Sequence, residues 1–211
     1  MYDIIFCALP PLQLYTIYSA PPALKGAVES AGYKAKCFDF AMEFLKTCNR
    51  DLELSARLQN YFIYKIDLAP EDRAIIDKFY DTVVDTVSNT DTKYIGFSVF
   101  SYYTHVITFD ILTRLKERGL TDKIILGGRG LTFDTTIGNV DESIVSAEER
   151  SMLFHEFLKS RGLAKHFILG DGLSAVIDFL NGQPAVEQNF GDDMLKVFYA
   201  NYDDYNFDDY Y

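Results

Sequence analysis

Three short apolar segments of this chain each end in very small residues, and this repeated pattern restricts the fold more than any other feature. The segments and the residues that end them are 124–126 before Gly127 and Gly128, 94–97 before Ser98, and 167–169 before Gly170, Asp171 and Gly172. A helical pattern follows each segment. Parallel strands that end in small residues leave their backbone open to a ligand, and open α/β sheets bind ligands at that edge. The pattern therefore predicts a ligand site at the carboxyl ends of parallel strands.

Apolar periodicity predicts five strands that alternate with helices along the chain. The expected strands are 4–9, 34–39, 94–98, 123–126 and 166–169, and the expected helices among them are 21–31, 104–118, a stretch within 144–161, and 173–181. This alternation is typical of an α/β protein with a doubly wound parallel sheet. For five strands we expect the flavodoxin-like, Rossmann-like order 2-1-3-4-5, which brings the ends of strands 1, 3 and 4 to one crevice.

Residues 40–91 interrupt this alternation between the second and third strands. Their apolar spacing predicts helices at about 40–49, 52–65 and 70–88, an inserted segment that would cover the sheet edge or the site. We therefore assign residues 1–182 to one α/β domain that includes this insertion. Residues 183–211 contain short extended pieces at 186–190 and 195–199 and an acidic, tyrosine-rich end. We expect them to form an extended tail or linker.

The composition excludes several classes of partner. The net charge of −11 disfavours direct binding to nucleic acid, which needs clustered Lys and Arg. No apolar stretch is long enough to cross a membrane, and the amino terminus lacks the basic start of a signal peptide, so we expect a cytoplasmic protein. The spacing of Cys7, Cys37 and Cys48 matches no metal or redox motif.

The motifs of other ligands that bind such folds are missing. The first loop has no glycine between Asp3 and Lys25, which excludes the Gly-x-Gly-x-x-Gly turn of dinucleotide-binding folds, and no P-loop sequence occurs. The first and third strands do not end in the aspartates of a response-regulator receiver. The three histidines form no pair with metal-ligand spacing. We expect His105, directly after the third strand, to face solvent or cap a helix rather than approach a ligand.

One family combines these features in the same order. The corresponding residues here are Leu9-Pro10-Pro11, Pro21-Pro22-Ala23-Leu24, Ala31-Gly32-Tyr33, Phe38-Asp39, Gly96-Phe97-Ser98, Leu126-Gly127-Gly128, Gly170-Asp171-Gly172 and Asn201-Tyr202-Asp203-Asp204-Tyr205. In this ordered set, which spans nearly the whole chain, the sequence resembles the N-terminal cobalamin-binding domain of B12-dependent radical SAM proteins. The resemblance implies that cobalamin binds at the carboxyl ends of the sheet and that residues 183–211 lead toward a radical SAM domain.

The resemblance also implies which residues hold the cofactor. They are Pro11, Leu12, Ser98, Ser101, Tyr102, Gly127, Gly128, Arg129, Gly170, Asp171 and Gly172. The serine hydroxyls would face the nucleotide tail of cobalamin, the glycines would leave room for it, and Arg129 would pair with a corrin amide or a phosphate. The loop 12–19 would face the corrin or the substrate. We expect a leucine at position 128 to block cobalamin while leaving the fold intact.

Two departures from the wider cobalamin-binding and radical SAM families limit what this chain can do alone. No histidine lies between Met1 and Thr104, so the Asp-x-His-x-x-Gly motif that ligates cobalt in mutases and methionine synthase is absent. The Cys-x-x-x-Cys-x-x-Cys motif is absent too. The [4Fe–4S] cluster and S-adenosylmethionine would therefore belong to a radical SAM domain in the same longer chain or in a separate subunit.

Two alternatives stay open at this point. The small residues also suit tight turns and helix caps that involve no ligand. In the second alternative, the domain binds no cofactor and acts as an interaction or substrate platform of the same fold. The insertion 40–88 and the tail 201–211 would then dock a partner.

Overall fold

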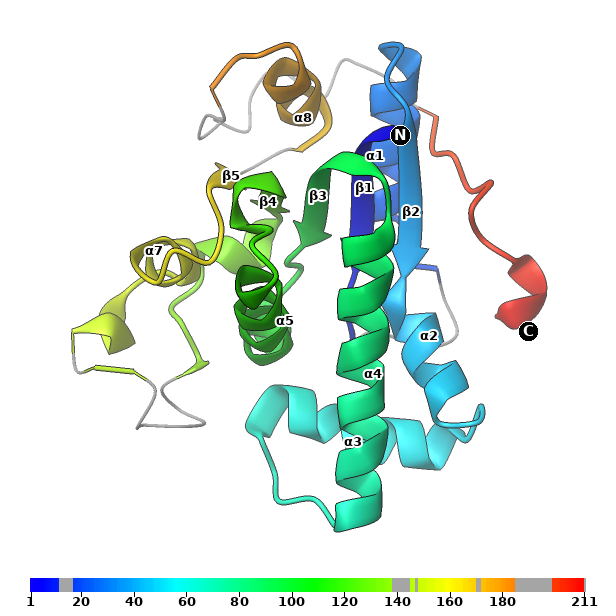
Figure 1. Cartoon of the computed structure of the whole chain (residues 1–211), viewed down its shortest axis with the longest axis vertical. Helices are drawn as coiled ribbons and strands as arrows, with labels where there is room; N and C mark the ends of the chain where they lie inside the picture. The colour runs from blue at the N-terminus through cyan, green and yellow to red at the C-terminus, as the bar shows by residue number, and fades with distance from the viewer. Residues whose placement is uncertain (12–16, 138–144, 147, 170–171, 185–198, 211) are drawn as a thin grey trace.

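The computed structural model describes residues 1–11, 17–137, 145–146, 148–169, 172–184 and 199–210. Its strands are β1 (Tyr2–Ala8), β2 (Ala35–Asp39), β3 (Thr92–Ser98), β4 (Ile124–Gly127) and β5 (His166–Ile168). They form one five-stranded sheet in the order β2-β1-β3-β4-β5, and every neighbouring pair is parallel (Figure 1). The predicted α/β fold class and strand order are confirmed.

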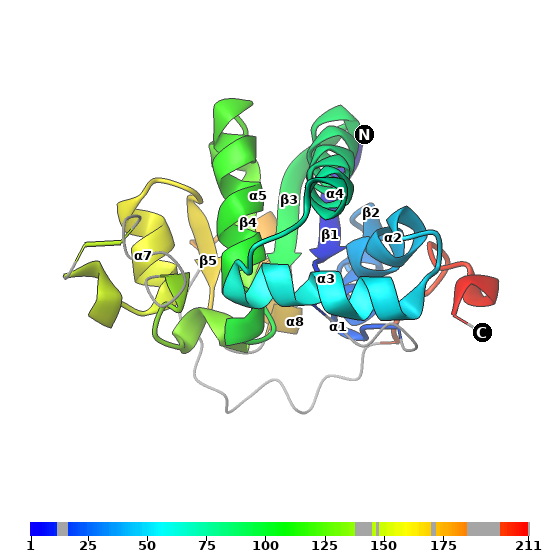
Figure 2. The same ribbon diagram turned by 90° about the horizontal axis from the view of Figure 1, so that it is seen from below.

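Helices connect the strands and cover both faces of the sheet. They are α1 (Ala20–Ser30), α2 (Phe40–Thr47), α3 (Leu52–Tyr64), α4 (Pro70–Asn89), α5 (His105–Glu117), α7 (Phe154–Ser160) and α8 (Gly172–Leu180). Figure 2 shows α1 and α8 on the opposite side of the strands from α4 and α5. The predicted helical insertion between β2 and β3 is therefore present as α2, α3 and α4.

Side chains of β1 alternate between two cores, as the pleat of a strand requires. Ile5 and Cys7 are fully buried in the larger core, which the insertion, α5 and α7 share. Ile4 and Phe6 point the other way, into the smaller core beneath α1 and α8. Because both faces are covered, β1 is apolar at nearly every position, which is the signature of a buried parallel strand.

Acidic side chains set where the first two inserted helices, α2 and α3, begin. The carboxylate of Asp39, the last residue of β2, accepts hydrogen bonds from the backbone N–H groups of Ala41 and Met42 at the start of α2. Asp51 accepts from the N–H of Leu54 at the start of α3. Each carboxylate satisfies donors that have no partner within their own helix. The chain thus turns from strand to helix at Asp39 without an intervening loop.

The carboxyl-terminal part of the described chain lies against the domain. Residues 199–210 run along the outer side of β2 and α2 (Figure 1). The extended pieces expected at 186–190 and 195–199 fall outside the described residues except for Tyr199. Within the described part of the chain, no helix combines the length and the apolar character that spanning a membrane requires.

Candidate functional site

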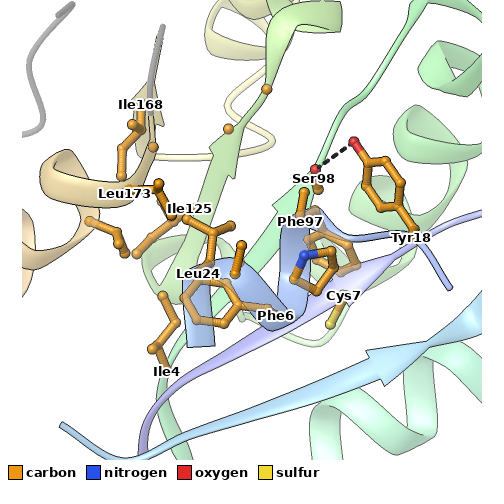
Figure 3. A pocket seen from close by; sticks show the side chains of 18 residues that line it. Ile4, Phe6, Cys7, Tyr18, Leu24, Phe97, Ser98, Ile125, Ile168 and Leu173 are labelled. Carbon is orange, nitrogen blue, oxygen red and sulfur yellow. Dashed lines mark hydrogen bonds between the residues drawn. The ribbon is translucent and has the colours of Figure 1, made fainter. Parts of the chain in front are cut away.

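A cavity of about 300 Å³ lies at the carboxyl edge of the sheet, on the face covered by α1 and α8 (Figure 3). It is lined by Ile4, Phe6, Cys7, Tyr18, Ala20, Pro21, Ala23, Leu24, Gly96, Phe97, Ser98, Ile125, Gly127, Gly128, Ile168, Gly172, Leu173 and Val176. Four neighbouring strands and two helices contribute to its wall, and most of the lining side chains are apolar. The cavity therefore lies where strand order reverses in this fold, the usual place for a ligand.

Two hydroxyl groups supply the polar contacts seen in this cavity. The hydroxyl of Ser98 donates to the hydroxyl of Tyr18, with 3.5 Å between the oxygens (Figure 3). Burial raises the pKa of Tyr18 above its usual value, so the phenol stays protonated. The ring of Tyr18 packs edge-on against Phe100, with centroids 5.3 Å apart. The cavity wall is uncharged and suits a neutral group.

Gly127 is the last residue of β4, and because it has no side chain it leaves room for a ligand. A Cβ atom placed on Gly127 would lie 3.6 Å from the carbonyl oxygen of Ile168, an ordinary contact, and would meet nothing closer. Its backbone is not in the left-handed region. An added methyl group would thus fit at the cavity wall without displacing its neighbours. Gly172, at the start of α8, lies nearer its neighbour, with 3.3 Å between a built Cβ and Leu24 Cδ2.

Gly128 has a different role, although it is adjacent in sequence. Its φ of 109° lies in the region that favours glycine, and a Cβ there would lie 2.5 Å from the carbonyl oxygen of Val99. Around it, Val99 N–H donates to Gly127 O at 2.7 Å, and Gly130 N–H donates to Val99 O at 2.9 Å. Gly128 therefore allows the loops after β3 and β4 to approach one another. The expectation that a leucine at position 128 leaves the fold intact is wrong.

Three other expected site residues lie at the same edge but do not line this cavity. Ser101 precedes a 3-10 turn, and its carbonyl accepts from the backbone N–H and the hydroxyl of Thr104. Tyr102 is 43% exposed and packs on Tyr103. Arg129 is exposed, with its guanidinium 6.0 Å from the ring centroid of Phe133.

The remaining expected residues divide into three groups. Ser98, Gly127, Gly128 and Gly172 line the cavity together. Pro11 is half-buried and follows β1, outside the cavity lining. Leu12, Gly170 and Asp171 lie outside the described residues.

His105 is completely buried, so the expectation that it faces solvent or caps a helix is wrong. Its Nε2 lies 2.8 Å from the carbonyl oxygen of Gly130, and its Nδ1 lies 3.4 Å from the backbone nitrogen of Thr136. Burial lowers the pKa of His105 to about 4, so the ring is neutral at pH 7. A neutral ring that donates from Nε2 and accepts at Nδ1 satisfies both contacts. The histidine thus fixes the loop after β4 and points away from the cavity.

Sequence reasoning missed the wall that α1 contributes. Pro21 and Leu24 line the cavity, and Ala20 and Ala23 leave space beside them. The available signal was the run of small and apolar residues at the start of this helix, which continues beyond what a single core face needs. Its meaning depends on where α1 lies over the sheet.

Exposed aromatic side chains lie on the loops that follow β3 and β4 and at the end of α3. They are Tyr64, Phe100, Tyr102, Tyr103 and Phe133, each at least 36% exposed. The inserted helix α3, which ends at Tyr64, contacts the 3-10 turn that carries Tyr102 and Tyr103. The insertion therefore adds to the rim of the site as well as to the core.

Comparisons with models of protein families, with curated proteins and with solved structures found no match to this chain. Over the described residues, no three His, Cys, Asp or Glu side chains come together as a metal-ligand group.

Proposed function

We propose that this chain is a cobalamin-binding domain that serves a radical SAM enzyme in methyl transfer or in a rearrangement. The observation that carries the proposal is the neutral, largely apolar cavity at the carboxyl edge of the sheet, into which Gly127 projects no side chain. The ordered resemblance of the sequence to such domains supports it. The cavity would receive the nucleotide tail of cobalamin.

The nucleotide tail suits this cavity chemically. It ends in a neutral bicyclic aromatic base on a ribose, and the wall offers apolar side chains together with the hydroxyls of Ser98 and Tyr18. A volume near 300 Å³ is at the lower end for ligand pockets, which begin at about 300 Å³. The cavity is therefore sized for a tail, and the broader corrin would remain outside, toward the exposed aromatic side chains. Bound cobalamin supplies methyl-transfer or radical chemistry.

In this proposal the protein holds cobalamin without a histidine on cobalt. No histidine is found among the described residues that line the cavity. His105 is the histidine nearest to β3 in sequence, and both of its ring nitrogens are engaged in the opposite core. The domain would therefore bind the cofactor through its tail. A radical SAM domain, in the same longer chain or in a separate cytoplasmic subunit, would hold the [4Fe–4S] cluster and S-adenosylmethionine.

A titration of the purified chain with hydroxocobalamin, followed by desalting and an absorption spectrum, tests the proposal. The wild type should retain a corrin spectrum. Gly127→Leu should fold but lose retention, because leucine fills the cavity, whereas Ser30→Leu, at the exposed end of α1, should bind as the wild type does. Absence of retention by the wild type would overturn the function. Equal retention by Gly127→Leu would overturn the site.

An interaction platform without a cofactor is the second candidate function. The exposed aromatic side chains at the carboxyl edge favour it, because such clusters mark sites of association. It predicts that the wild type retains no cobalamin and that Gly127→Leu changes nothing. The same titration therefore separates the two candidates.

A further inference from the structure

The carboxyl-terminal segment 199–210, called the strap below, holds the helix that forms one wall of the cavity. Asn201 donates its backbone N–H to the carbonyl oxygen of Pro22 at 2.9 Å. The side-chain amide of Asn201 also donates to the Glu29 carboxylate at 2.6 Å. These contacts attach the strap to both the first and the last turn of α1.

A buried ion pair ties the strap to the middle of α1. Lys25 is only 4% exposed, and its Nζ lies 2.6 Å from Asp204 Oδ2. The same carboxylate oxygen accepts the backbone N–H of Cys37 in β2 at 2.9 Å. Without Asp204, Lys25 would be a buried cation lacking its counter-ion, which is strongly unfavourable. The position of α1 therefore depends on the strap.

Gly26 shows how closely the strap crosses α1. A Cβ atom built on Gly26 would lie 1.8 Å from the carbonyl oxygen of Tyr199, a distance that no side chain tolerates. Glycine inside a helix is otherwise unfavourable relative to alanine. At this position it permits backbone to pass directly over the helix.

Opposite sides of the same helical turns face the strap and the cavity. Pro21 and Leu24 line the cavity, whereas Pro22, Lys25 and Gly26 contact the strap. A shift of α1 that separated it from the strap would therefore move one wall of the cavity. Tyr205 of the strap is itself buried in the smaller core beneath α1 and α8.

We infer that the strap is a positioning device for the ligand cavity: when it is seated, α1 is held in place and the cavity keeps its shape. Detachment of the strap loosens α1 and lowers the affinity of the cavity for its ligand. A partner that competed for the strap would thereby lower the affinity of the cavity. The part of this inference that concerns cobalamin rests on the proposed function, whereas the coupling between strap and helix does not.

The test measures hydrogen–deuterium exchange of α1 and hydroxocobalamin affinity in the full chain. The variants are Asp204→Ala, which removes the counter-ion, and Gly26→Ala, which displaces the strap while improving helix propensity. Ser30→Ala, a change at an exposed residue of the same helix, is the matched control. Without ligand, both strap variants should exchange the amide hydrogens of α1 faster than the control. Their affinity for hydroxocobalamin should be about tenfold or more lower than that of the control.

The outcomes separate this inference from the proposed function. Unchanged α1 exchange in the folded Gly26→Ala variant overturns the inference, even if Asp204→Ala fails to fold. Faster α1 exchange with unchanged hydroxocobalamin affinity overturns the coupling to the cavity. If the wild type does not bind hydroxocobalamin while α1 exchange still responds, the strap-to-helix coupling stands and the cobalamin proposal fails.

Discussion

The imidazole of His105 lies face to face with the ring of Phe154, with centroids 3.8 Å apart and planes inclined by 15°. This stacking covers one face of the imidazole ring, and the carbonyl oxygen of Gly130 accepts a hydrogen bond from Nε2. A proton added at Nδ1 would place a charge in a site that is closed to water and would turn Nδ1 into a donor facing the N–H of Thr136. Protonation of His105 is therefore opposed by the fold.

The burial of His105 predicts a loss of stability in mild acid. The unfolded imidazole takes up a proton below pH 6.5, whereas the folded one does so only near pH 4, so the unfolded state binds more protons in this window. The free energy of unfolding should fall as pH falls from 6.5 toward 4, by about 3 kcal/mol from this group. Urea unfolding at several pH values measures how the free energy of unfolding depends on pH. In His105→Gln the slope should be correspondingly smaller, and an equal slope in both proteins would contradict the assignment.

The two adjacent glycines should respond differently to alanine. Gly127→Ala adds a methyl group to open space and should change stability by less than about 1 kcal/mol. Gly128→Ala forces a left-handed conformation and a contact with Val99, and it should cost about 2 kcal/mol or more. Thermal and urea unfolding compare them. Equal destabilisation by the two changes would be evidence against the close approach at Gly128.

The ion pair between Lys25 and Asp204 should behave as a unit. Lys25→Met leaves the Asp204 carboxylate with the Cys37 N–H but no cation, and Asp204→Ala leaves Lys25 buried and unpaired. Each single change should cost about 3 kcal/mol, and the double change Lys25→Met/Asp204→Leu should cost clearly less than the sum. A double-mutant cycle by urea unfolding gives the coupling. Strict additivity would show that the pair contributes nothing.

A second polar cluster joins the inserted helices to α5. The hydroxyl of Tyr80, which is 1% exposed, donates to the carboxylate of Asp110 at 2.6 Å, and Lys65 pairs with the same carboxylate. Asp110→Ala should cost about 2 kcal/mol, because the phenol hydroxyl of Tyr80 is left buried without an acceptor. The single change Tyr80→Phe removes the hydroxyl donor itself and should cost about 1 kcal/mol. Adding Tyr80→Phe to Asp110→Ala should therefore cause little further loss in urea unfolding; a fully additive loss would contradict this account.

The strand order could be predicted because it rests on local patterns and a general rule. Apolar runs that end in small residues mark parallel strands, and the alternation with helices leaves few ways to arrange five of them. The insertion was also visible, since Phe79, Val83 and Val87 recur at helical spacing and are all buried.

The details of the site depended on contacts between distant parts of the chain. Gly127 and Gly128 have the same side chain, and they differ only because pairing of β3 with β4 brings Val99 against the second of them. The burial of His105 requires the loop at Gly130 and helix α7, which lie 25 or more residues further along. No local pattern predicts that Lys25 pairs with a carboxylate 179 residues away.

The contact between Asp204 and the N–H of Cys37 also protects the sheet against association with other copies of the chain. β2 is an outermost strand of the sheet, and an open strand edge invites pairing with the edge of another molecule. The strap places a carboxylate on that edge and carries its own backbone alongside. Molecules whose strap has come away would present β2 to one another, so loss of this segment favours aggregation through the sheet.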